Sequence, residues 1–188
     1  MGRTPSIMAF AMPSLFRPHF ASLALAFLAA CSPTFNWREV PIGEDGVVAL
    51  LPCKADHATR ALPLGGAESV AVDVSGCEAG GATFAVAHAT ATSTVQAEAW
   101  MSAWRAATRT RLAGASIQEA AAVVQRAASS PAPGRLDAQG AGASATPTHV
   151  LWFAQQGAGK VSLYQATVLG KPSSAEAIKT FFEGLRVP

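Results

Sequence analysis

Two apolar stretches separated by a short turn decide the fold of this chain: Thr148-His-Val-Leu-Trp-Phe-Ala154 and Lys160-Val-Ser-Leu-Tyr-Gln-Ala-Thr-Val-Leu169. Their β-branched and aromatic residues favour strands, and the intervening residues 155–159 include two glycines suited to a turn. Residues 150–153 are apolar at every position, which is typical of a strand covered on both faces. The pattern therefore predicts a hairpin at the centre of a sheet.

More strands are predicted upstream of this hairpin. Residues 69–74 alternate with valines and pair with residues 83–88 through the glycine-containing segment 75–81, which is a second hairpin signal. Residues 47–51 form an apolar run stopped by Pro52. After a polar loop at 54–59, residues 60–64 predict an edge strand, because Pro63 cannot donate to a ladder. A short extended piece is expected at residues 37–40.

Two helices are predicted from caps and spacing. Ser93 and Gln96 fit a capping box, a helical stripe follows, and Gly114 is a suitable stop. Ser173 and Glu176 fit a second capping box before the C-terminal stripe. The stripes contain Trp100, Met101, Trp104, Thr108 and Leu112 in the first helix, and Ile178, Phe181, Phe182 and Leu185 in the second.

The segment between the first helix and the central hairpin is harder to assign. Residues 116–128 are rich in alanine and fit a helix, or a strand at 121–124. Residues 129–147 contain three prolines and three glycines and predict a loop, with a short strand near 135–139. The whole pattern predicts an α+β fold with a mostly antiparallel sheet and helices packed on it, as a single domain over residues 46–188.

Two resemblances follow from these residues. The order of elements, the strand stopped by Pro52 and the ending Phe181-Phe-Glu-Gly-Leu-Arg resemble the PsbP-like αβα sandwich. Trp37-Arg-Glu-Val, Leu50-Leu-Pro-Cys-Lys54 and Cys77-Glu-Ala-Gly-Gly-Ala-Thr-Phe84 resemble small proteobacterial envelope lipoproteins of no assigned activity. The second resemblance implies a location and a fold, and it brings no catalytic residue.

The N-terminal segment is typical of a bacterial lipoprotein signal. An eleven-residue, mainly apolar run at 20–30 follows Arg17, which is the order of a secretory signal and is too short to span a bilayer. Leu28-Ala-Ala-Cys31 resembles a lipobox, which implies cleavage of residues 1–30 and lipidation of Cys31. The same resemblance implies that Ser32, in place of an aspartate, favours the periplasmic face of the outer membrane, with residues 31–45 as a lipidated tether.

Composition disfavours one class of protein and excludes another. The 188 residues include 14 Lys and Arg against 12 Asp and Glu, but residues 1–30 hold two arginines and no acid, so the chain from Cys31 onward is neutral. Nucleic-acid binding is disfavoured because it needs a concentrated basic excess. A polytopic membrane protein is excluded because no apolar stretch reaches about 20 residues. Alanine supplies 41 of the hydrophobic residues, so the core is thin.

Cys53 and Cys77 are the two remaining cysteines. In an oxidising exported compartment an even number of cysteines favours a disulfide. A zinc site made of Cys53, His57, Cys77 and His88 is the alternative, but neither a CxxC nor an HxxxH spacing supports it. Free thiols are a third reading. We expect the disulfide and no metal.

The chain offers little catalytic chemistry. No Gly-x-Ser-x-Gly elbow is present, and His57, His88 and His149 are isolated in the sequence. The stretch Gly157-Ala-Gly-Lys160 lacks the first glycine of a phosphate loop and has Val161 in place of Ser or Thr. We therefore predict no catalytic residue and no cofactor.

The resulting hypothesis is a non-enzymatic envelope lipoprotein, held on the membrane by its lipid, that binds an envelope protein. The edge strand at 60–64 could accept a strand of that partner. The alternative is a lipid-anchored small-molecule-binding protein or enzyme with its pocket near Trp100 and Trp104.

Overall fold

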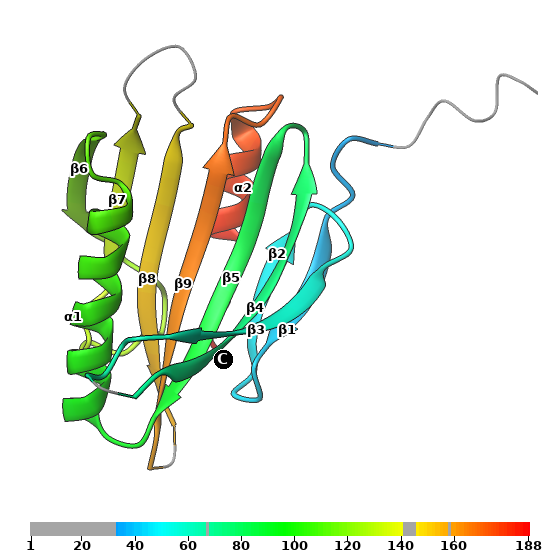
Figure 1. The fold of residues 1–188 in the computed structure, drawn as a ribbon. Helices are drawn as coiled ribbons and strands as arrows, with labels where there is room; N and C mark the ends of the chain where they lie inside the picture. Colours follow the sequence, from blue (N-terminus) through cyan, green and yellow to red (C-terminus); the bar gives the residue numbers. More distant parts are fainter. Residues whose placement is uncertain (1–32, 67, 141–145, 158) are drawn as a thin grey trace, which may run out of the picture. The chain divides into compact units, whose positions relative to one another are not determined.

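Both predicted hairpins lie in one seven-stranded antiparallel sheet, with the strand order β3–β4–β5–β9–β8–β7–β6 (Figure 1). The structure is a computed structural model that describes residues 33–66, 68–140, 146–157 and 159–188, and its folded unit spans Thr34–Pro188. The predicted α+β class with a mostly antiparallel sheet is confirmed. The elements are β1 (Arg38–Ile42), β2 (Val47–Leu51), β3 (Asp56–Leu62), β4 (Val70–Ala79), β5 (Ala82–Ala91), α1 (Thr94–Arg111), β6 (Ser116–Ala121), β7 (Gly134–Gln139), β8 (Thr148–Gln156), β9 (Val161–Gly170) and α2 (Glu176–Glu183).

The two hairpins join through a long ladder between β5 and β9. Their register runs from Ala82 opposite Gly170 to Ala91 opposite Val161. Within the β4–β5 hairpin, Gly80 and Gly81 have φ of 58° and 84°, the left-handed conformation that a two-residue type I′ turn requires. The predicted turn over 75–81 is therefore only these two residues, and β4 continues as far as Ala79.

The sheet has two differently covered faces (Figure 1). The helix face carries α1, which packs against side chains of β7, β8 and β9 such as Leu136, Trp152 and Leu163. The opposite face, called the hairpin face below, carries the β1–β2 hairpin and α2. The period-2 alternation of the strands separates the two cores, so that in β9 Leu163 faces the helix and Tyr164 faces the hairpin.

Each core depends on large buried residues. Those of the helix face include Met101, Trp104 and Trp152, and those of the hairpin face include Leu51, Phe84, Phe153, Tyr164 and Phe181. The prediction that β8 is covered on both faces is confirmed, because Val150, Leu151, Trp152 and Phe153 are all buried. In the described part of the chain, no helix is long and apolar enough to cross a membrane.

The first predicted cap is confirmed and the second is wrong. Ser93 is the N-cap of α1, and its hydroxyl accepts a hydrogen bond from the Gln96 backbone N–H. For α2 the N-cap is Ala175, without a side-chain hydrogen bond. Ser173 instead donates its backbone N–H to the Gly80 carbonyl, which fixes it against the β4–β5 turn.

Four other predictions needed correction. Residues 116–121 form strand β6, so the helical reading of 116–128 is wrong: pairing with β7 overrides the helix propensity of alanine. The strand considered at 121–124 is thus displaced toward the N-terminus. The loop predicted at 54–59 ends early, because β3 already begins at Asp56. The short extended piece expected at residues 37–40 is confirmed as strand β1, which pairs with β2, so the segment 31–45 is not a tether throughout.

A disulfide between Cys53 and Cys77 connects the two layers of the hairpin face. Cys53 follows β2, Cys77 lies in β4, and their Cα atoms are 5.9 Å apart. The bridge closes a loop with a sequence separation of 24 residues, for which the chain-entropy model gives about 3 kcal/mol of stabilisation. It holds the β1–β2 hairpin against the sheet.

Removal of this bridge should lower the free energy of unfolding by about 3 kcal/mol. We expect Cys53→Ala, Cys77→Ala and the double variant to lose similar amounts in urea unfolding, because each removes the same cross-link. Reductant should lower the wild-type midpoint and leave that of the double variant unchanged. An unchanged wild-type midpoint under reducing conditions would contradict this account.

Candidate functional site

The outer edge of β3 is one end of the sheet in the described part of the chain. Residues from Asp56 to Ala61 are exposed, and Leu62 is half-buried. On its inner side, every residue of β3 is in register with β4. The edge therefore belongs to an ordered strand rather than to a frayed end.

The register shows which backbone groups of β3 face outward. A two-residue hairpin closes on a hydrogen-bonded pair, here Ala79 and Ala82, and such pairs recur at every second residue of an antiparallel ladder. Followed through β4 into β3, this alternation directs the N–H and C=O groups of His57, Thr59 and Ala61 away from the sheet. These three residues offer three donors and three acceptors to another chain.

The sequence predicted an edge strand in this region, but with bounds and a reason that differ from those of β3. Pro63 suggested an edge strand over residues 60–64, but Pro63 lies beyond the end of β3. Leu64 turns into the helix-face core and is 2% exposed. The polar residues 56–59, which carry most of the edge, gave no strand signal because they do not alternate with apolar residues.

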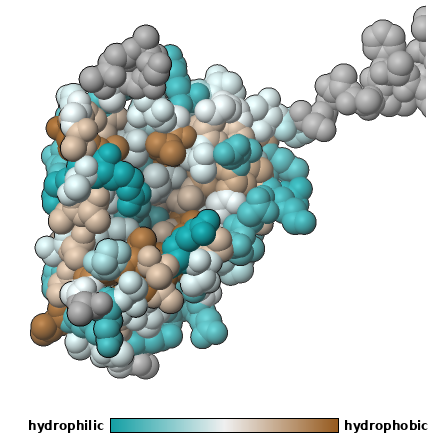
Figure 2. Space-filling view, viewed as in Figure 1, coloured by the Kyte–Doolittle hydropathy of each residue, from teal (hydrophilic) through white to brown (hydrophobic). Residues whose placement is uncertain are grey.

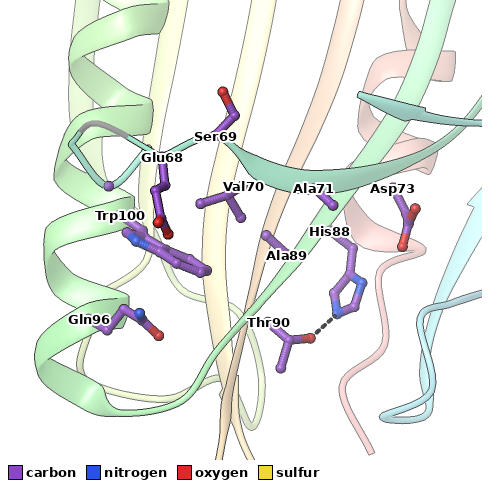
Figure 3. Close-up of a pocket in the computed structure, with 11 residues that line it drawn as sticks. Glu68, Ser69, Val70, Ala71, Asp73, His88, Ala89, Thr90, Gln96 and Trp100 are labelled. Atoms are coloured by element: carbon purple, nitrogen blue, oxygen red, sulfur yellow. Dashed lines mark hydrogen bonds between the residues drawn. The ribbon is translucent and has the colours of Figure 1, made fainter. Parts of the chain in front are cut away.

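A hollow of about 510 Å³ lies beside Trp100, where β4 separates from β5 (Figure 3). The two strands pair from Asp73 opposite His88 toward their turn, but β4 residues 70–72 have no register with β5. The loop before β4 and the N-terminal half of α1 complete the rim. We call this space, lined by Gly65, Glu68, Ser69, Val70, Ala71, Asp73, His88, Ala89, Thr90, Gln96 and Trp100, the Trp100 hollow.

The lining of the Trp100 hollow is polar and acidic. Glu68 and Trp100 project into the space between the loop and α1 (Figure 3). Asp73 accepts a hydrogen bond of 2.6 Å from the Thr59 hydroxyl, which connects the hollow to the β3 edge. Trp100 is half-buried and lines this hollow, whereas Trp104 is 2% exposed and forms part of the core.

His88 lies between the hollow and the hairpin face. It is 8% exposed, and its ring packs against Tyr164 with centroids 5.0 Å apart and the planes tilted by 31°. The β1–β2 turn approaches so closely that a Cβ added at Gly43 would lie 2.7 Å from the ring, and Gly43 has φ of 68°. His88 Nε2 lies 3.3 Å from the Thr90 hydroxyl, and its Nδ1 is buried without a hydrogen bond. Burial lowers the pKa of His88 below 6.5, although Asp45, Asp73 and Glu44 oppose this and Lys160 adds to it.

The other two histidines have structural partners. The ring of His57 lies 2.9 Å from the Ser75 hydroxyl, across the β3–β4 pair. His149 Nδ1 lies 2.5 Å from Asp137, which also receives a two-point contact from Arg135. The described side chains bring no serine, threonine or cysteine into hydrogen-bond contact with His149, so the geometry gives this His–Asp pair no nucleophile.

Asp45 and Lys160 connect two turns. Asp45 forms an ion pair of 2.9 Å with Lys160, accepts a hydrogen bond from Ser162, and its backbone carbonyl accepts one from Gln155. The Ser162 hydroxyl and then Lys160 lower the pKa of Asp45. Lys160 thus binds a carboxylate of the β1–β2 turn. This ion pair gives the lysine after Gly157 and Gly159 a structural role that does not involve a phosphate.

The cysteines are used as the sequence predicted. Cys53 and Cys77 bond to each other, so neither is a thiolate ligand, and His57 and His88 contact Ser75 and Tyr164 instead. Within the described residues, no group of three or more His, Cys, Asp or Glu side chains could hold a metal ion. Cys31 and the rest of the predicted signal lie outside the described residues.

Comparisons with known proteins do not assign the chain to a family. No protein-family model matches it, and no curated protein is significantly similar to it. The candidate functional features are therefore those of the structure itself: the β3 edge and the adjoining Trp100 hollow.

The buried neutral His88 should make stability depend on pH. Because its folded-state pKa lies below 6.5, the unfolded chain binds its proton first, so the free energy of unfolding falls as the pH drops from about 6.5 to the folded pKa. Each unit by which the pKa is lowered corresponds to about 1.4 kcal/mol.

We expect His88→Phe to remove this dependence, because phenylalanine keeps the stacking on Tyr164 and cannot take up a proton. Urea unfolding between pH 5 and 8 measures the difference between the variant and the wild type. Parallel losses of stability in both proteins would show that His88 is not the source.

Proposed function

We propose that the chain is a lipid-anchored envelope lipoprotein on the periplasmic face of the outer membrane that binds a partner protein by strand addition at β3, without catalysis. The location rests on the resemblance of Leu28-Ala-Ala-Cys31 to a lipobox and on Ser32. The binding activity rests on one observation, which is the ordered and exposed β3 with outward backbone groups at His57, Thr59 and Ala61.

Strand addition suits the chemistry of this edge. Main-chain hydrogen bonds would supply affinity, and side chains of the added strand would supply specificity. On the helix face, β3 borders a hollow of about 650 Å³ whose lining includes Asp56, Ala58 and Val74. Alternate side chains of a partner peptide could enter this hollow. The nearby disulfide at Cys53 limits the movement of the start of β3.

The polar clusters of the described residues favour binding over catalysis. His57, His149 and Asp45 each have a partner that accounts for them structurally. Their contacts hold strands and turns together rather than pointing at a shared reacting position.

Strand addition predicts position-specific crosslinking in cells. A photoreactive residue at Ala61 should give one discrete protein adduct, while the same residue at Ala120, which is also exposed but lies on the β6 edge, should not. Thr59→Pro should reduce the Ala61 adduct about tenfold, because it removes an outward N–H and adds a ring at the edge.

Thr59→Val is the matched control and should keep the adduct, since both variants lose the hydrogen bond to Asp73. An undiminished adduct in Thr59→Pro, or equal labelling at Ala120, would overturn the assignment to β3. In the same cells palmitate should label the wild type and not Cys31→Ala; labelling that persists would overturn the proposed anchor.

A second function, small-molecule binding, is favoured by the Trp100 hollow. Its volume of about 510 Å³ is within the range of ligand sites, and Glu68 and Asp73 would favour a cationic ligand. A ligand held there would be lost in Trp100→Ala and retained in Thr59→Pro, which separates the two functions.

A further inference from the structure

A second space on the helix face differs chemically from the Trp100 hollow. It is a cleft of about 280 Å³ between α1 and the twisted β3–β4 pair, and Figure 2 shows hydrophobic residues in this part of the surface. Its walls are Leu62, Val72 and Val74 on one side and Trp104 on the other, with Ala85 and Ala87 in the floor. We call this space the Trp104 cleft.

The polar side chains in the floor of the Trp104 cleft are occupied by one another. Gln165 accepts hydrogen bonds from Trp152 Nε1 at 2.9 Å and from the Thr108 hydroxyl at 3.3 Å, and it donates to Thr167 at 3.2 Å. These contacts fix the amide and use its oxygen and one of its two N–H groups. A ligand in the cleft therefore meets mainly aliphatic and aromatic surface at its base.

The charges of the Trp104 cleft have one sign. Arg60 of β3 and Arg111 at the end of α1 line it, and no carboxylate does. Among the described residues neither arginine is in an ion pair, in contrast to Arg109, Arg135 and Arg186. Two guanidinium groups from opposite walls can bind one carboxylate or phosphate through charge-assisted hydrogen bonds.

We propose that the Trp104 cleft binds an anionic amphiphile with a single aliphatic chain. The chain packs on the half-buried Val74, Ala85 and Ala87. The anionic head lies between Arg60 and Arg111. We assign the site one chain because its volume is only about 280 Å³. This site does not use the outward backbone groups of β3, although it shares Val74, Thr83 and Ala85 with the hollow that borders β3.

Photolabelling of the full chain in phosphatidylcholine nanodiscs tests the proposal. The probe is a twelve-carbon carboxylic acid with a diazirine near the end of its chain. We expect adducts to map to β5 and to α1 between Trp104 and Arg111. A probe of the same length with a trimethylammonium head should label these peptides at least tenfold less.

Variants separate the apolar and charged parts of the site. Ala87→Leu fills the floor and should reduce labelling at least tenfold, and Ala85→Leu provides the same test if the first variant does not fold. The double variant Arg60→Gln, Arg111→Gln should reduce labelling about tenfold, because it removes both charged donors. Arg38→Gln, an exposed arginine outside the cleft, is the matched control and should change labelling less than twofold.

Competition experiments show which anionic head group the site prefers. Unlabelled dodecanoate and dodecyl phosphate both support the proposal if they compete, and the stronger competitor shows whether a carboxylate or a phosphate head is preferred. Equal labelling by the ammonium probe, unchanged labelling in folded Ala87→Leu, or equal losses in Arg38→Gln and the double variant would each overturn it. Retention of labelling in Thr59→Pro is expected even if strand addition fails.

Discussion

One helix has to cover the helix face of a seven-stranded sheet, and the rest of the structure depends on this constraint. Six spacings of about 4.8 Å make such a sheet roughly 29 Å wide, whereas a helix with its side chains is about 10 Å across. Helix α1 packs on β9 and on the end of β5, and its core also contains residues of β7 and β8. The strands β3 and β4 and the first half of β5 must therefore complete their burial by other means.

Three features of the β3–β5 side answer this constraint. The helix-face positions of β5 are small, with Ala85 and Ala87 only half-buried. The start of β4 leaves β5, and the loop before it brings Leu64 into the core. These adjustments leave the Trp104 cleft and the Trp100 hollow on the helix-face side, and β3 as an open edge. The other face is covered by the β1–β2 hairpin and α2, and the Cys53–Cys77 bridge holds the hairpin in place. This cover and cross-link compensate for a thin, alanine-rich core.

Local patterns in the sequence were sufficient for the hairpins, the Ser93 cap, the disulfide and the fold class. They were insufficient where pairing partners decide the structure: β6 is a strand because β7 lies beside it, and the alanines of 116–128 carry no period of their own. The full length of β3 was missed because its residues are polar and exposed. A pocket near Trp100 and Trp104 was considered from the sequence, but its shape could not be foreseen, since it depends on the separation of β4 residues 70–72 from β5.

The central claim is that the β3 edge is ordered on its inner side and open on its outer side. Native-state hydrogen exchange across β3 tests this claim most directly. The account predicts alternation: the amides of Ala58, Arg60 and Leu62 should be protected by β4, while those of His57, Thr59 and Ala61 should exchange at nearly unprotected rates. Uniform protection of all six amides would contradict the account, because it would mean that another part of the chain already covers the edge.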